Sequence, residues 1–151
     1  QGGALTGVWA KDLTRGSILE ALRARRCFAT NGNRTVLDFR ANSHPVGSDV
    51  TSNEDVKLKV RINATRPVKK VSLFRNGDIF EERRGGKPKV SFQLTDRPGA
   101  GNHFYYIEVE LTPLQRTPMG ARCGNLQVAE GDYAWSSPIW VTTGSQIAKR
   151  K

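Results

Sequence analysis

The residue types that most often carry catalysis are scarce and scattered in this sequence. Its two histidines, His44 and His103, are predicted to lie in polar loops flanked by glycine or proline. Neither has a second histidine or a cysteine at the spacing of a zinc site. The acidic pairs at 54–55 and 81–82 are sequential, and sequential side chains of a strand point to opposite faces. We therefore expect no catalytic residue, no metal ligand and no cofactor in this chain.

Positive charge is the strongest compositional signal. The chain has 24 Lys and Arg against 14 Asp and Glu, a formal net charge of +10, which favours anionic partners. Lys57, Lys59 and Arg61 alternate with apolar residues over 56–62 (VKLKVRI), so the three cations are predicted to face water from one side of a strand. They form a candidate anion-facing surface, although a solvated basic face explains the same pattern. Nucleic-acid binding is disfavoured because no basic motif interleaved with aromatic residues is present.

Aromatic residues near the C-terminus form a second candidate ligand surface, made of Tyr133, Trp135 and Trp140. Carbohydrate-binding modules use exposed rings of this kind as a platform. The odd spacing of the two tryptophans, however, would place them on opposite faces of an unbroken strand. We therefore favour packing in the core and keep a sugar-binding platform as the alternative.

Two cysteines, Cys27 and Cys123, are too few for a disulfide scaffold. We favour free, partly buried thiols, and whether the two pair stays open. No run of about 18 apolar residues occurs, so we expect no membrane partner. The chain begins at Gln1 with no visible signal peptide, and we expect it to be a piece of a longer protein. The compartment stays undetermined, with a periplasmic or secreted parent as one option.

Hydrophobic periodicity predicts one helix followed by strands. Residues 1–13 are expected to be irregular, and Thr14 is expected to cap a helix that ends near Cys27. Residues 112–132 read as a long irregular connection. A hairpin turn is expected at Asn76–Gly77, with the chain returning from residue 78. The other predicted strands are 35–40, 56–62, 68–74, 89–94, 104–111 and 137–141.

About seven short strands separated by turns argue for a mainly β fold. We expect an antiparallel β-sandwich of immunoglobulin or fibronectin III type, preceded by one short α-helix. The expected division is an N-terminal segment over 1–33, the sandwich over 34–144 and a basic tail over 145–151. A single short amphipathic helix is marginal alone, so its apolar face must dock on something.

Several segments resemble one known family. Residues 3–10 (GALTGVWA) and 13–32 (LTRGSILEALRARRCFATNG) are similar to the end of the catalytic region in proteins of domain of unknown function 3604. Residues 104–109 (FYYIEV) resemble a late strand of that family, and 134–141 (AWSSPIWV) resemble its C-terminal signature. These proteins are relatives of the PHP (polymerase and histidinol phosphatase) metal-dependent phosphoesterases.

The resemblance implies that catalysis belongs to a region that precedes this chain. In the family, a cluster of His, Asp and Glu ligands in a distorted βα barrel holds divalent metal, and those ligands normally come before the segment that 3–10 resembles. Segment 1–33 would then be the tail end of that truncated catalytic region. The implied partners are the chain's own missing catalytic domain and an anionic phosphoester substrate.

The sequence thus predicts a non-catalytic β-sandwich accessory domain, the C-terminal part of a PHP-like phosphoesterase of unknown substrate. Its duty would be structural or would position the substrate for the parent enzyme. A carbohydrate-binding module is the first alternative, and a nucleic-acid-binding domain, which requires salt-dependent binding, is the second.

Overall fold

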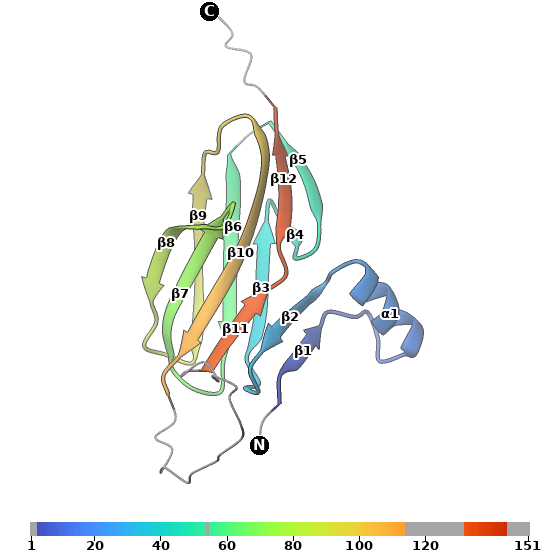
Figure 1. The fold of residues 1–151 in the computed structure, drawn as a ribbon, viewed down its shortest axis with the longest axis vertical. Helices are drawn as coiled ribbons and strands as arrows, with labels where there is room; N and C mark the ends of the chain where they lie inside the picture. Colours follow the sequence, from blue (N-terminus) through green and yellow to red (C-terminus); the bar gives the residue numbers. More distant parts are fainter. Residues whose placement is uncertain (1–2, 54, 114–131, 145–151) are drawn as a thin grey trace, which may run out of the picture.

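Two β-sheets and one short helix make up the part of the chain that the computed structural model describes, residues 3–53, 55–113 and 132–144 (Figure 1). The larger sheet holds β1 (Leu5–Val8), β2 (Cys27–Thr30), β5 (Asp49–Ser52), β7 (Val68–Arg75), β8 (Asp78–Arg84), β10 (Gly101–Leu111), β11 (Asp132–Ser136) and β12 (Ile139–Thr143). The smaller sheet holds β3 (Val36–Ala41), β4 (His44–Pro45), β6 (Val56–Asn63) and β9 (Lys89–Asp96). The helix is α1 (Arg15–Arg23).

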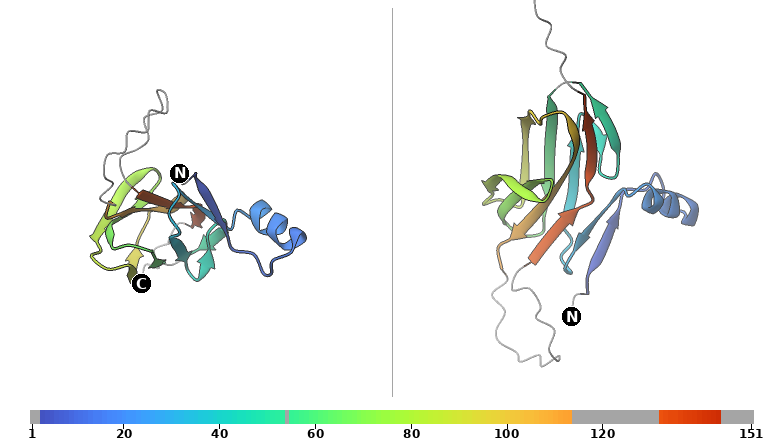
Figure 2. Two further views of the ribbon diagram at one scale, coloured as in Figure 1. Left: turned by 90° about the horizontal axis from the view of Figure 1, so that it is seen from below. Right: turned by 45° about the horizontal axis from the view of Figure 1, so that its top comes forward.

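The two sheets face each other across one hydrophobic core, which makes the domain a β-sandwich (Figure 2). Alternate residues of each strand point inward, as the period of two requires. The core therefore draws on both sheets, with Leu37, Phe39, Leu58 and Val60 from the smaller sheet and Val71, Leu73, Tyr105, Ile107 and Val109 from the larger. The predicted mainly β sandwich with one short helix is confirmed, but the sheets are not wholly antiparallel as predicted, because β5 pairs parallel with β12.

Strand β10 organises the larger sheet because its eleven residues pair along both edges. One edge pairs antiparallel with β7, which continues to β8. The other edge pairs with β12 near its start and with β11 near its end. The chain leaves β11 at Ser136 and enters β12 at Ile139, so two short strands share an edge that one long strand would otherwise fill.

The N-terminal segment belongs to the same sheet. Strand β1 pairs with β2, and β2 pairs with β11 about a hundred residues later. The prediction that 1–13 is irregular is therefore wrong over β1, and the sheet continues across the expected boundary at residue 33. The two-residue strand β4 was not predicted, and neither were three longer strands, β2, β5 and β11. Each of these three is four or five residues long and exists because a distant strand offers it an edge.

Helix α1 begins as predicted and ends earlier than predicted. The Thr14 hydroxyl accepts a hydrogen bond from the Ser17 backbone N–H at 3.3 Å, which is the expected N-cap. The helix ends at Arg23 rather than near Cys27, because Arg25 adopts a left-handed conformation with φ 58°. Its guanidinium is held there by the Gly47 carbonyl oxygen at 2.9 Å. Within the described ranges, no helix combines the length and apolar character needed to cross a membrane.

Two polar contacts join distant parts of the sandwich. The buried Tyr105 hydroxyl of β10 donates to the Asp96 carboxylate at the end of β9, 2.8 Å away, and Arg75 of β7 donates to the same carboxylate at 2.9 Å. This network ties the larger sheet to the smaller one. Elsewhere, largely buried Arg66 pairs with Asp132, the first residue of β11. The predicted 112–132 connection lies outside the described residues apart from its ends.

Candidate functional site

The outer face of the smaller sheet gathers the predicted cations. Lys57, Lys59 and Arg61 all point away from the core, because Val56, Leu58, Val60 and Ile62 between them are buried. We call the outward side of β3, β6 and β9 the basic face. Its charged side chains are Asp38 and Arg40 from β3, Lys57, Lys59 and Arg61 from β6, and Lys89 from β9.

Strand register brings two further cations beside the predicted three. Arg40 pairs with Lys59 across β3 and β6, and Lys89 pairs with Asn63 across β6 and β9. The predictions missed both cations. The alternation within 35–40 and 89–94 would have placed them outward, but only the pairing shows that they share the face with β6. Five cations against the single carboxylate of Asp38 leave this face with a formal charge of +4.

Asp38 lies between the two guanidinium groups of the basic face and is hydrogen-bonded to one of them. One carboxylate oxygen accepts from Arg40 Nε at 2.8 Å, and the other lies 3.9 Å from Arg61 Nη1. A guanidinium has five N–H donors, so these contacts leave most of them available to a ligand. Asp38 thus orients Arg40, lies within ion-pair distance of Arg61 and cancels only part of their charge.

The lysines of the basic face are less constrained. The ammonium groups of Lys57, Lys59 and Lys89 make no ion pair with any residue in the described ranges. The backbone under Lys57 is nevertheless fixed, because its N–H donates to the Asn42 side chain at 2.8 Å and its carbonyl accepts from the Asn42 N–H at 2.9 Å. These cations therefore project from a rigid strand.

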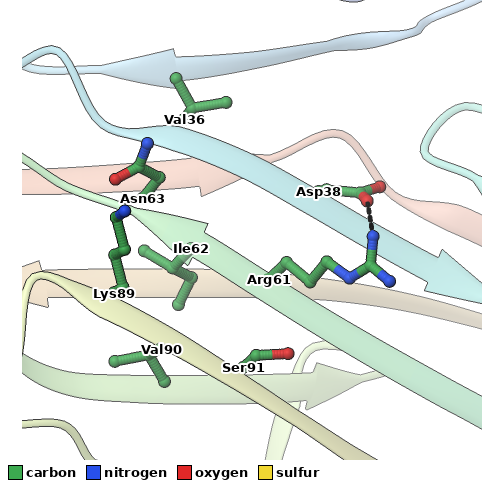
Figure 3. Close-up of a pocket in the computed structure, with 8 residues that line it drawn as sticks. All are labelled: Val36, Asp38, Arg61, Ile62, Asn63, Lys89, Val90 and Ser91. Atoms are coloured by element: carbon green, nitrogen blue, oxygen red, sulfur yellow. Dashed lines mark ion pairs between the residues drawn. The ribbon is translucent and has the colours of Figure 1, made fainter.

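Two hollows mark the basic face. The first, of 430 Å³, lies near the Asn63 end of β6 and is drawn in Figure 3. Lys89 and Asn63 lie together at one side of this view, and the Asp38–Arg61 pair lies at the other. Val36 adds an exposed apolar side chain to this lining, whereas Ile62 is buried and Val90 packs against the core. Such a lining suits a ligand with an anionic group beside a less polar part.

The second hollow, of 490 Å³, lies toward the other end of β6. Its lining is more polar, with Arg40, Lys57 and Lys59 supplying charge and Asn42, Ser43 and Gln93 supplying neutral hydrogen-bonding groups. Arg61 lines both hollows. The two hollows are therefore neighbours along one strand.

A third hollow, of 550 Å³, is cationic in composition but largely neutralised. Lys70 donates to Glu82 at 2.7 Å, and Lys69 donates to Glu110 at 2.6 Å. This hydrogen bond between Lys70 and Glu82 lowers the pKa of Glu82 and raises the pKa of Lys70, so each group favours the charged state of the other. This region, which includes Gly85 and Gly86, suits an anionic ligand less well than the basic face does.

The predicted aromatic surface lies on the opposite side of the molecule, on the outer face of the larger sheet. Trp135 pairs in register with Glu108 of β10, and Trp140 pairs with Phe104. Both tryptophans and Tyr133 are half-buried and lie outside the hydrophobic core. The expected core packing is therefore wrong. The chain turns between β11 and β12, so the odd spacing of the tryptophans does not place them on opposite faces.

Ring orientation argues against a flat sugar platform at these residues. Tyr133 and Trp135 stack on each other at 5.6 Å, and the indole N–H of Trp135 donates to Glu108 at 2.8 Å. The ring of Trp140 is covered by the Arg25 guanidinium at 4.4 Å. Sugar binding needs an open ring face, and here one face of each ring is turned toward a protein group. The aromatic ligand surface stays a prediction.

Neither histidine lies in a loop as predicted. His44 opens β4 and His103 lies in β10, where its ring contacts Asn76 Nδ2 at 3.2 Å and donates to the Gly99 carbonyl oxygen at 2.8 Å. These contacts tie the Asn76 turn to the neighbouring loop. Across the residues that the structure describes, no group of three His, Cys, Asp or Glu side chains is placed to hold a metal ion. Cys27 is free and its Sγ lies 3.2 Å from Ser137 Oγ, while Cys123 lies outside the described residues.

Comparison with known proteins supports part of the resemblance noted in the sequence. A family model described as "Protein of unknown function (DUF3604)" matches residues 1–68, which contain β1, α1 and the first strands of the sandwich. This match confirms the similarity inferred from 3–32. The segments 104–109 and 134–141 lie beyond the residues that the family model matches.

Longer relatives extend the similarity over most of the chain. Uncharacterized proteins of Chlamydia pneumoniae and Chlamydia muridarum are each 32% identical over 91% of this chain, and one from Chlamydia trachomatis is 30% identical over the same share. The chain spans only 22% of the length of these relatives. Among solved structures, the CARDB domain of a Pyrococcus furiosus protein, crystallised with di-metal ions, matches 76% of this chain and 96% of its own at 11% identity and a TM-score of 0.39. The chain is therefore similar to DUF3604 over residues 1–68 and to much longer chlamydial proteins over nearly all of its length.

Proposed function

We propose that this chain is a non-catalytic accessory domain of a PHP-like metal-dependent phosphoesterase, an immunoglobulin-like sandwich whose basic face positions the anionic substrate. The observation that carries the proposal is the basic face itself: five cations and one carboxylate on a rigid sheet, beside two hollows. A surface of one sign concentrates ligands of the opposite sign and raises their association rate. Divalent metal and catalytic residues would belong to the rest of the parent.

The exposed side chains around α1 support attachment to a larger body. Leu19 and Leu22 are 38% and 40% exposed, and Leu13, just before the helix, is 94% exposed. Within the helix, only Ala21 is buried. A nine-residue helix has little stability of its own, so an apolar face of this kind gains from a covering partner. We take that partner to be the catalytic region of the parent, since the chain spans only about a fifth of its relatives.

Charge reversal in the full-length parent tests the positioning role. We expect Lys57→Glu with Arg61→Glu to lower kcat/KM for a phosphoester substrate about 10-fold at low salt, because steering by opposite charge is lost. The loss should shrink at ionic strengths above about 0.15 M, where exposed charges are screened. The matched control is Arg84→Glu with Lys87→Glu, which changes net charge equally at exposed positions outside strands β3, β6 and β9.

A second variant distinguishes loss of folding from loss of electrostatic steering in the parent. If the double Glu variant unfolds, Lys57→Gln with Arg61→Gln removes the same positive charges without adding negative ones. Unchanged kcat/KM and unchanged salt dependence in a folded basic-face variant would refute the positioning role. An equal loss in the control variant would also refute it, because the effect would then come from net charge alone.

A further inference from the structure

The two hollows of the basic face follow one strand. They share Arg61, and one extends toward Asn63 while the other extends toward Lys57. The eight residues of β6 span about 26 Å at a rise of about 3.3 Å per residue. Each hollow alone is large enough for a small ligand. A ligand that fills both must be elongated along β6.

Cations repeat along this strand at a regular interval. Lys57, Lys59 and Arg61 lie on the same side and recur every second residue, which places their Cα atoms about 7 Å apart. A single small phosphoester would contact only one or two of them. A chain that carries anionic groups at intervals would contact all three at once and release several counterions.

A row of neutral polar residues runs beside the cations. Ser91, Gln93 and Thr95 of β9 pair in register with Arg61, Lys59 and Lys57, and each is exposed on the same face. Hydroxyl and amide groups donate and accept hydrogen bonds, which matches sugar or polyol hydroxyls. Phosphate oxygens would use only the donors of this row, whereas ligand hydroxyls would use its donors and its acceptors.

The basic face lacks the rings that single-stranded nucleic acids use. Proteins that bind such strands combine a basic groove with aromatic side chains on which the bases stack. The described outward-facing positions of β3, β6 and β9 carry no aromatic residue. Those positions are Val36, Asp38, Arg40, Lys57, Lys59, Arg61, Asn63, Lys89, Ser91, Gln93 and Thr95.

We infer that the ligand of the basic face is a linear polymer of phosphodiester-linked polyol or sugar units that lies along β6. Its phosphodiester groups contact Lys57, Lys59 and Arg61, and its hydroxyl groups contact the polar row of β9. This inference rests on the proposed function, because it names the class of phosphoester that the accessory domain presents to its parent.

Chain length is the variable that tests the inference. The 151-residue chain is titrated with glycerol phosphate units joined as a monomer, a trimer and a hexamer, and binding is followed by calorimetry. We expect at least about a 10-fold gain in affinity from monomer to hexamer. For three neutralised phosphates, the slope of log K against log salt concentration should be about −2. Lys57→Glu with Arg61→Glu should abolish the gain, and Arg84→Glu with Lys87→Glu should preserve it.

Each other outcome overturns the inference in a distinct way. Equal affinity for monomer and hexamer would show a small-molecule site. If none of the three glycerol phosphate probes binds, the proposed class of ligand is wrong. Tighter binding of a hexamer of thymidylate would assign the face to nucleic acid. If the Glu variant unfolds, Lys57→Gln with Arg61→Gln gives the same readout. The kinetic test in the parent uses a small phosphoester, so the positioning role stands or falls independently of polymer binding.

Discussion

Removing the Tyr105 hydroxyl should weaken the connection between the two sheets by a measurable amount. Tyr105 is fully buried, and its hydroxyl donates at 2.8 Å to Asp96, which also accepts from Arg75. Tyr105→Phe keeps the ring and deletes one hydrogen bond to a charged group. Bonds of this kind contribute about 1.5–3 kcal/mol to the free energy of unfolding, and that is the loss we expect in urea denaturation at pH 8.

The same contact makes stability depend on alkaline pH. Burial, and then the hydrogen bond to Asp96, raise the pKa of Tyr105 well above its usual value of 10.0. In the unfolded chain this tyrosine ionises near pH 10, while in the folded protein it stays neutral. Its contribution is therefore complete below pH 10 and is lost as pH rises toward the folded pKa. At pH 11 the wild-type protein should lose about 1.4 kcal/mol that Tyr105→Phe does not lose.

Tyr106→Phe is the matched control because Tyr106 lies on the outward side of the same strand. We expect it to change the free energy of unfolding by less than about 0.5 kcal/mol. Two results would refute the reasoning about Tyr105. One is a loss no larger than in the control. The other is a difference between wild type and Tyr105→Phe that is the same at pH 8 and at pH 11.

Two further predictions concern the N-terminal segment. A Cβ at Gly7 would lie 2.0 Å from the Phe28 ring, so Gly7→Ala should lower the free energy of unfolding by about 1–3 kcal/mol. Gly16 lies in open space within α1, so Gly16→Ala should raise it by about 0.5–1 kcal/mol. Chemical denaturation measures both changes, and an unchanged stability of Gly7→Ala would contradict the close packing of β1 against the Phe28 ring of β2. Leu13→Ser with Leu19→Ser should change the free energy of unfolding of the isolated chain by less than about 1 kcal/mol but lower the thermal midpoint of the full-length parent. Equal midpoints for the variant parent and the wild-type parent would argue against docking through α1.

Elements whose signals are local could be predicted from the sequence. Strict alternation gave β6 and the outward direction of Lys57, Lys59 and Arg61. The Asn76–Gly77 pair gave the turn between β7 and β8, with φ values of 55° and 93°. In each case the residues that carry the signal are adjacent in the chain, so no long-range pairing was needed to interpret them.

Features that depend on distant pairing could not be predicted in the same way. Strands β1 and β2 lack alternation and form because β11 provides an edge. Arg40 and Lys89 join the basic face only through the register of β3 and β9 with β6. Trp135 and Trp140 lie on the same face of the larger sheet because a turn separates their strands. One continuous strand would have placed them on opposite faces.

The pairing of β2 with β11 has a consequence for biosynthesis. Residues 27–30 leave the ribosome about a hundred residues before the strand that completes their hydrogen bonds. The nascent N-terminal segment must therefore wait with an open edge, and long-range β pairing of this kind is slow to form. The region matched by the family model ends at Val68, the first residue of β7, so a fragment cut at that point would lack every strand from β7 to β12. Such a fragment should be prone to aggregate during synthesis, and we expect a unit that folds to extend to β12.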